Sequence, residues 1–319
     1  MTTVKTRHLT AGILGAATAI ATLATAPAAQ AAPRDGVLPQ QRDTSVTVGR
    51  LVLEPTDRGY RGSVPLTVSY RGRGTADLRV TVTEPVAGAF ANLDSDFPCF
   101  FAEREGELRR DIECGANPIR GGERREYTID FEVLTTTQAY AMSAVGGAVA
   151  VRTVDAQPLT VTTGFDTVFR STTGSVRDPR PYVQDTQTDA AVQAGPATLV
   201  RQPDGSFLGQ VPLVVRYDGD APHDMLHLEA LLPDGVELRG IDPSAVCGFP
   251  WCEVPGGRFM PGEERSMELL ISAPAGTAPG DLGAGSVRLG AGFFLSELSD
   301  VDPSDNTAGF TITALDSAV

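Results

Sequence analysis

Two stretches of the chain alternate apolar and polar residues with a period of two: residues 64–70 read VPLTVSY and residues 211–217 read VPLVVRY. That period places alternate side chains on one face, so each stretch predicts a β-strand with a buried side. Similar patterns predict further strands at 78–82, 127–133, 148–153, 226–232, 267–272, 286–294 and 310–312. Segments rich in Gly and Pro separate them, as expected for turns, and no long helical period appears after the first thirty residues.

The two stretches belong to a longer internal repeat. Residues 62–72 (GSVPLTVSYRG) and 209–219 (GQVPLVVRYDG) are identical at seven of eleven positions. Later landmarks recur in the same order, including Cys99 with Cys247. Two unrelated β domains would not share this order, so we interpret the chain as a tandem duplication in which each copy is a whole domain.

Many short strands separated by turns predict an all-β protein of two tandem Ig-like β-sandwiches, at residues 44–169 and 189–319. The segment 170–188 between them is polar and rich in turn residues, and we expect a linker there. Because proline lacks an N–H, Pro65 and Pro212 are expected at a strand start or a sheet edge.

The first 31 residues have the three parts of a secretory signal peptide. Lys5 and Arg7 precede an uncharged run over 11–26, which ends before Ala29-Gln30-Ala31. An uncleaved membrane anchor is the alternative, but this run is short of the roughly 20 residues that span a bilayer. We therefore predict cleavage after Ala31, a flexible mature N-terminus over 32–43, and a protein released outside a bacterial cell.

Charge and composition exclude several classes of partner. The 40 acidic residues outnumber the 26 basic ones, which gives a net charge of −14. Nucleic acid and anionic membranes both need a basic surface, so we expect neither as a partner.

The four cysteines predict two disulfides, because an even number in an exported chain is typical of a disulfide framework. Each copy carries its own pair, which favours Cys99–Cys114 and Cys247–Cys252 among three connectivities. Closing these loops should stabilise the fold by roughly 3 and 2 kcal/mol in the chain-entropy model. A redox role is the alternative, and the spacing is not that of a Cys-x-x-Cys motif.

Several segments of the second copy are similar to segments of a known domain family. They are Gly219-Asp220-Ala221, Leu232-Pro233-Asp234-Gly235, the cysteine pair, Pro261-Gly262-Glu263 and Asp302-Pro303-Ser304-Asp305-Asn306. Together they resemble the extracellular Ig-like repeats of bacteria known as CARDB-like domains, over most of 196–315 and more faintly over 44–168. The first copy lacks the closing Asp-Pro-x-Asp-Asn segment. The resemblance implies a non-catalytic module of a secreted or surface protein.

Two segments of the second copy are candidate binding sites. Carboxylate and amide oxygens crowd one segment at Asp300, Asp302, Asp305 and Asn306, as a calcium site requires, although the Gly and bidentate Glu of an EF-hand loop are missing. An acidic turn that bonds its own backbone is the favoured alternative.

Phe249 and Trp251 lie in the short loop between Cys247 and Cys252. An aromatic side chain held on a rigid loop is suited to anchor a glycan or a protein. Covering the edge of the core beside the disulfide is the equal alternative for Trp251.

Catalytic groups are scarce. After signal cleavage the only histidines are His223 and His227. Zinc would need a third ligand, so we favour a solvent-facing pair. No Gly-x-Ser-x-Gly motif surrounds a serine, and nothing singles out a pair of carboxylates. We therefore expect no catalytic residue and no cofactor, with calcium as the one cofactor hypothesis. The expected function is extracellular interaction, adhesion or scaffolding with an unknown protein or glycan. A carbohydrate- or calcium-binding module is the second hypothesis, and a secreted hydrolase is the third.

Overall fold

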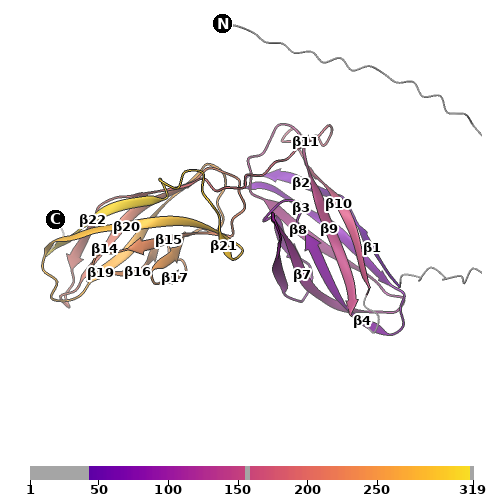
Figure 1. The fold of residues 1–319 in the computed structure, drawn as a ribbon, viewed down its shortest axis with the longest axis horizontal. Coiled ribbons are helices and arrows are strands. Elements are labelled where there is room, and N and C mark those ends of the chain that lie inside the picture. Colours follow the sequence, from indigo (N-terminus) through magenta and orange to yellow (C-terminus); the bar gives the residue numbers. More distant parts are fainter. Residues whose placement is uncertain (1–42, 155–158, 317–319) are drawn as a thin grey trace, which may run out of the picture. The chain divides into compact units, whose positions relative to one another are not determined.

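The computed structural model describes residues 43–154 and 159–316. The described chain is built of strands alone, with no helix, and forms two sandwich-like domains (Figure 1). The predicted all-β fold class is therefore confirmed. The predicted signal peptide, and the predicted flexible segment up to residue 42, lie outside the described residues.

The first domain contains eleven strands. They are β1 (Thr44–Val48), β2 (Leu51–Thr56), β3 (Gly59–Tyr70), β4 (Thr75–Thr83), β5 (Phe90–Leu93), β6 (Cys99–Arg104), β7 (Glu107–Arg120), β8 (Arg124–Val133), β9 (Met142–Val154), β10 (Thr160–Phe169) and β11 (Arg180–Pro181). Strands β1, β3, β5 and β8 make one layer and β10, β9, β4, β7 and β6 the other. Strand β2 pairs antiparallel with β3 and parallel with β10, which links the two layers.

The second domain also contains eleven strands. They are β12 (Ala190–Ala194), β13 (Ala197–Arg201), β14 (Phe207–Tyr217), β15 (Met225–Leu231), β16 (Glu237–Asp242), β17 (Cys247–Gly248), β18 (Trp251–Glu253), β19 (Glu263–Ala273), β20 (Gly280–Phe293), β21 (Ser296–Glu297) and β22 (Thr307–Leu315).

The strands of the two domains are joined in the same order. The first runs β5-β8-β3-β2-β10-β9-β4-β7-β6 and the second β16-β19-β14-β13-β22-β20-β15-β18-β17. In each order the last two strands are the hairpin that holds the cysteine pair. Every predicted strand overlaps a strand of the structure. The segment predicted as a linker includes β11, which pairs with β9.

The repeated sequence motif forms the central strands β3 and β14, and its apolar positions face the cores. The core side chains of β3 are Val64, Leu66, Val68 and Tyr70, and those of β14 are Val211, Leu213, Val215 and Tyr217; all of them are buried. The period-two prediction is confirmed at these positions.

The glycine that opens each motif is needed for a close approach between strands. A Cβ atom at Gly62 would collide with the carbonyl oxygen of Val52 on β2, and one at Gly209 with that of Thr198 on β13. Any side chain at either position would therefore push the neighbouring backbone away.

The expectation that Pro65 and Pro212 begin a strand or lie at a sheet edge is wrong. Pro65 lies inside β3, where it pairs with β8 on one side. On its other side the neighbouring chain passes from β1 to β2, and neither strand pairs with Pro65. No ladder partner therefore needs the missing N–H, and the carbonyl of Pro65 accepts a hydrogen bond from Gly49 N at 3.0 Å. Pro212 has the same place between β12 and β13, with Gly195 N as donor at 2.8 Å.

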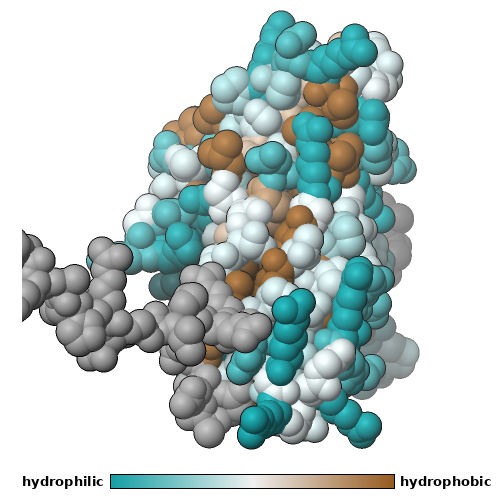
Figure 2. Space-filling view, turned by 90° about the vertical axis from the view of Figure 1, so that its right-hand side faces the viewer, coloured by the Kyte–Doolittle hydropathy of each residue, from teal (hydrophilic) through white to brown (hydrophobic). Residues whose placement is uncertain are grey.

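Each domain has its own hydrophobic core of aliphatic and aromatic side chains. The surface drawn in Figure 2 mixes hydrophilic and hydrophobic residues, with the hydrophobic ones in small separate groups. In the part of the chain that the structure describes, we find no helix long and apolar enough to cross a bilayer.

Candidate functional site

Both predicted disulfides are present, Cys99–Cys114 between β6 and β7 and Cys247–Cys252 between β17 and β18. Each joins residues that face each other directly in the strand register. Each hairpin lies at the end of its sheet order, with its outermost strand paired on one side only among the described strands. The cystines therefore fasten hairpins at sheet edges, and two disulfides indicate an oxidising environment such as the outside of a cell.

The hairpin of the second domain presents the two aromatic residues singled out from the sequence. Phe249 is 83% exposed at the tip. Trp251 is 36% exposed and points away from the core, since the next residue, Cys252, is fully buried. The indole ring lies against Gly248, where a Cβ would be 3.4 Å from it. Trp251 thus rests on the outer surface of the hairpin.

A row of polar side chains continues from Trp251 across the outer face of the sheet. The strand register places Trp251 of β18 opposite Glu229 of β15, and Glu229 opposite Arg288 of β20. Arg288 donates to both oxygens of Glu297, at 2.7 and 3.2 Å, and its Nε lies 3.4 Å from a carboxylate oxygen of Glu229. One guanidinium therefore contacts two carboxylates, and one of these, Glu229, lies opposite Trp251 in the register.

The ion pairs affect the acidity of the carboxylates. Hydrogen bonding to the Arg288 guanidinium lowers the pKa of Glu297, and the same contact raises the pKa of Arg288. Both groups are partly exposed, so solvent screening limits what the pair adds to stability. Glu297 is thus held in its ionised form, as a hydrogen-bond acceptor.

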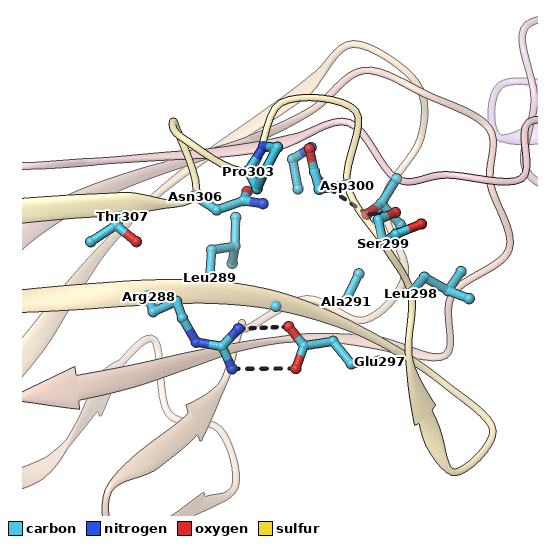
Figure 3. Close-up of a pocket in the computed structure, with 13 residues that line it drawn as sticks. Arg288, Leu289, Ala291, Glu297, Leu298, Ser299, Asp300, Pro303, Asn306 and Thr307 are labelled. Atoms are coloured by element: carbon cyan, nitrogen blue, oxygen red, sulfur yellow. Dashed lines mark hydrogen bonds and ion pairs between the residues drawn. The ribbon is translucent and has the colours of Figure 1, made fainter.

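A cavity of about 350 Å³ adjoins this row. Figure 3 shows Arg288 and Glu297 joined on one side of the cavity, with Pro303, Asn306 and Asp300 on the opposite side. A volume near 350 Å³ lies at the lower end of the range of small-ligand sites.

The equivalent face of the first domain lacks these groups. In the first domain the corresponding row begins one position from the cystine, where Phe100 lies opposite Glu113. Glu113 lies opposite Thr81 on the next strand, and Thr81 lies opposite Ala150. Glu113 thus takes the place of Trp251, and Ala150 that of Arg288. The combination of indole and bridged carboxylates belongs to the second domain alone among these two rows.

The acidic segment of the second domain bonds mainly to its own surroundings. Asp300 accepts from Thr188 Oγ1 at 3.0 Å, Ala190 N at 3.1 Å and Asp302 N at 2.9 Å. Asp302 accepts from Ser304 N at 3.1 Å and from its hydroxyl at 2.6 Å. These contacts are those of an acidic turn.

The other two predicted calcium ligands differ from this pair. Burial, followed by repulsion from Asp302 and Asp300, raises the pKa of Asp305, while the Oδ1 atom of Asn306 is buried without a hydrogen-bond partner. Among the residues that the structure describes, no group of three or more His, Cys, Asp or Glu side chains is placed to hold a metal ion. Calcium binding stays a prediction.

The expectation of a solvent-facing histidine pair is wrong for His223, which is only 4% exposed. Its Nε2 accepts from Phe259 N at 2.8 Å, so the proton is on Nδ1, 3.2 Å from the carbonyl oxygen of Ala221. Burial lowers the pKa of His223 to about 4. His227 lies on the outer face of β15, as expected, with its ring over Gly290. The two rings therefore do not form a metal site.

A buried ion pair in the first domain was not predicted from the sequence. Glu84 is 0% exposed and receives Nη2 of Arg110 at 3.1 Å, together with the backbone N–H groups of Gly88, Phe90 and Arg110 at 3.0–3.1 Å. Arg110 also contacts Asp224 at 3.1 Å. A single Glu after a strand gives no signal of such a role, and its dense set of partners indicates a structural function.

Comparisons with known proteins assign this chain to no family. No family model matches it, and no curated protein matches it. The CARDB-like resemblance stays a prediction for that reason.

Some solved structures align with most of the chain at low similarity. The tip adhesin CupB6 from Pseudomonas aeruginosa is 11% identical, with a TM-score of 0.28, over 86% of this chain and 99% of its own. A protein of unknown function from Porphyromonas gingivalis is 12% identical, with a TM-score of 0.23, over 85% and 99%. The E. coli chaperone DraB is 8% identical, with a TM-score of 0.23, over 85% and 97%. These TM-scores are too low to show a common fold.

Proposed function

We propose that this chain is a secreted, non-enzymatic interaction module that attaches to an extracellular protein or glycan through the cystine-closed hairpin of its second domain. Two parts of this proposal, the export of the chain and the duplication of its domain, are supported by the sequence. The observation that carries it is the exposure of Phe249 and Trp251 on a hairpin fixed by Cys247–Cys252.

Exposed apolar side chains gather at this hairpin. Leu231 and Val246 flank it and are exposed like Phe249. The backbone under them is held by the cystine and by pairing to β15, including a bond from Ala230 N to the carbonyl of Pro250 at 2.9 Å. An apolar anchor on a preformed loop loses little conformational entropy on binding, which favours affinity.

The chemistry of the same face supports binding over catalysis. A general acid at neutral pH needs a carboxyl group with a raised pKa. Arg288 lowers the pKa of Glu297 instead. The Glu297 carboxylate is therefore suited to accept hydrogen bonds from a partner.

Attachment is tested with labelled mature protein added to intact producing cells and to their isolated walls. We expect Phe249→Ser to weaken attachment at least tenfold, because it removes the apolar anchor. Leu208→Ser removes an exposed apolar side chain from β14 of the same domain and serves as the matched control. Equal attachment of both variants and the unmodified protein would contradict the proposal.

A further inference from the structure

The structure assigns a ligand class to the outer face of β18, β15 and β20: we propose that it binds a neutral polysaccharide, with one sugar ring on Trp251 and sugar hydroxyls on the Glu229–Arg288–Glu297 row. This inference rests on the proposed function and specifies its partner. It is carried by the geometry of the row and by the cavity beside it.

The indole of Trp251 provides the apolar contact. Its ring lies against Gly248 on the outer surface, where it is partly exposed. The C–H face of a sugar ring is apolar, and a rigid aromatic side chain covers it with little loss of entropy.

The charged groups beside the indole provide the polar contacts. Glu229 and Glu297 both contact Arg288 and are partly exposed, so they offer hydrogen-bond acceptors to a ligand in solvent. Hydrogen bonds from hydroxyl groups to ionised carboxylates are shorter and stronger than neutral ones. A chain of hydroxyl groups matches this row better than an apolar protein surface does, since the core of a protein interface is depleted in charge.

The charge of the face selects against anionic glycans. Glu229, Glu253 and Glu297 supply three carboxylates and Arg288 one guanidinium. Glu253 stands opposite His227 in the register, one row from Trp251. An anionic sugar placed here would meet an excess of negative charge, which repels it.

The length of the site indicates a chain rather than a single sugar. The register continues from Arg288 to Thr307 on β22, so the row from Trp251 to Thr307 crosses three gaps between strands. At about 4.8 Å for each gap the row is roughly 14 Å long. Arg288 and Glu297 also line the cavity of about 350 Å³, which gives space for a continuing chain or a side branch (Figure 3).

The experiment is a titration of the mature protein with cellohexaose, maltohexaose and chitohexaose, with an oligosaccharide of hyaluronan as the anionic comparison. Trp251 is the single tryptophan of the chain, so its fluorescence reports the site directly. We expect at least one neutral oligosaccharide to change this fluorescence saturably, and hyaluronan to leave it unchanged. No response to any neutral probe, or a stronger response to hyaluronan, would overturn the inference.

Variants test the individual contacts. Arg288→Gln and Glu229→Gln should each weaken binding at least tenfold in calorimetry, with little change in stability because both side chains are on the surface. Trp251→Phe should still bind the oligosaccharide, but more weakly. Phe100→Ala on the first domain should leave oligosaccharide binding unchanged. Binding by Arg288→Gln as tight as that of the unmodified protein would contradict the assigned row.

The two proposals fail in different ways. Attachment to cells that depends on Phe249, but is unaffected by Arg288→Gln and by competing neutral oligosaccharide, overturns the glycan site and leaves the interaction module. Attachment to no cell, wall or oligosaccharide overturns both.

Discussion

The buried His223 makes the stability of the second domain depend on pH. Its Nε2 accepts a hydrogen bond from Phe259 N, and protonation of that nitrogen would break the bond. Burial opposes the charged form, assisted by the charges of Arg258 and Arg265 and partly offset by the Ala221 carbonyl and by Asp224. The folded pKa of about 4 is below the ordinary value of 6.5.

The sign and size of the effect follow from proton linkage. Between pH 6.5 and 4 the unfolded chain binds a proton at this histidine and the folded chain does not, so stability decreases as pH falls through that window. At 1.36 kcal/mol for each pKa unit the complete loss is about 3 kcal/mol, of which about 2 kcal/mol has occurred by pH 5. Above pH 6.5 this histidine contributes almost nothing to the pH dependence.

Urea unfolding at pH 7 and pH 5, followed by Trp251 fluorescence, measures the loss in the domain that contains His223. In His223→Gln, which cannot titrate, the decrease between these pH values should be smaller by about 2 kcal/mol. His227→Gln is the matched control, since His227 lies on the outer face, and it should behave like the unmodified protein. Equal decreases in the unmodified protein and His223→Gln would refute the reasoning, as would an NMR titration of His223 near pH 6.5.

Further predictions concern the ion pair, the cystine and the acidic segment. Glu84→Ala should destabilise the first domain by about 3 kcal/mol or more in urea, because it leaves Arg110 and three backbone N–H groups without their buried acceptor; an unchanged midpoint would contradict this. Combining Cys247→Ser with Cys252→Ser should lower the free energy of unfolding by roughly 2 kcal/mol, and equal urea midpoints would show that the cystine adds no stability. The melting temperature should be the same with calcium and with chelator, since the acidic segment bonds its own backbone; a rise with calcium would revive the calcium hypothesis.

Much of the fold could be predicted from the sequence because β-strands with one buried face leave a period of two. The motif around Pro65 carries that signal clearly, and every strand predicted in this way overlaps an observed strand. Strands such as β6, whose side chains are largely exposed, have no alternation to detect. The place of Pro65 inside β3 depends on where a neighbouring strand changes partner, which a local pattern does not contain.

The candidate site was predictable only in part. The loop between two close cysteines drew attention to Phe249 and Trp251, because proximity in sequence is enough to define that loop. Glu229 and Arg288 join the site through strand register, across 59 positions of sequence. His223 was misplaced because it precedes β15, so the alternation that correctly orients His227 does not extend to it.

The two cystines also determine what a proteolytic cut does to the chain. A cut at the exposed tip between Cys247 and Cys252, or in the longer loop between Cys99 and Cys114, leaves both new ends joined by sulfur. The nicked protein would migrate as one chain on a gel until a reductant separates the fragments. A cut in either of these two segments would thus release no fragment under oxidising conditions.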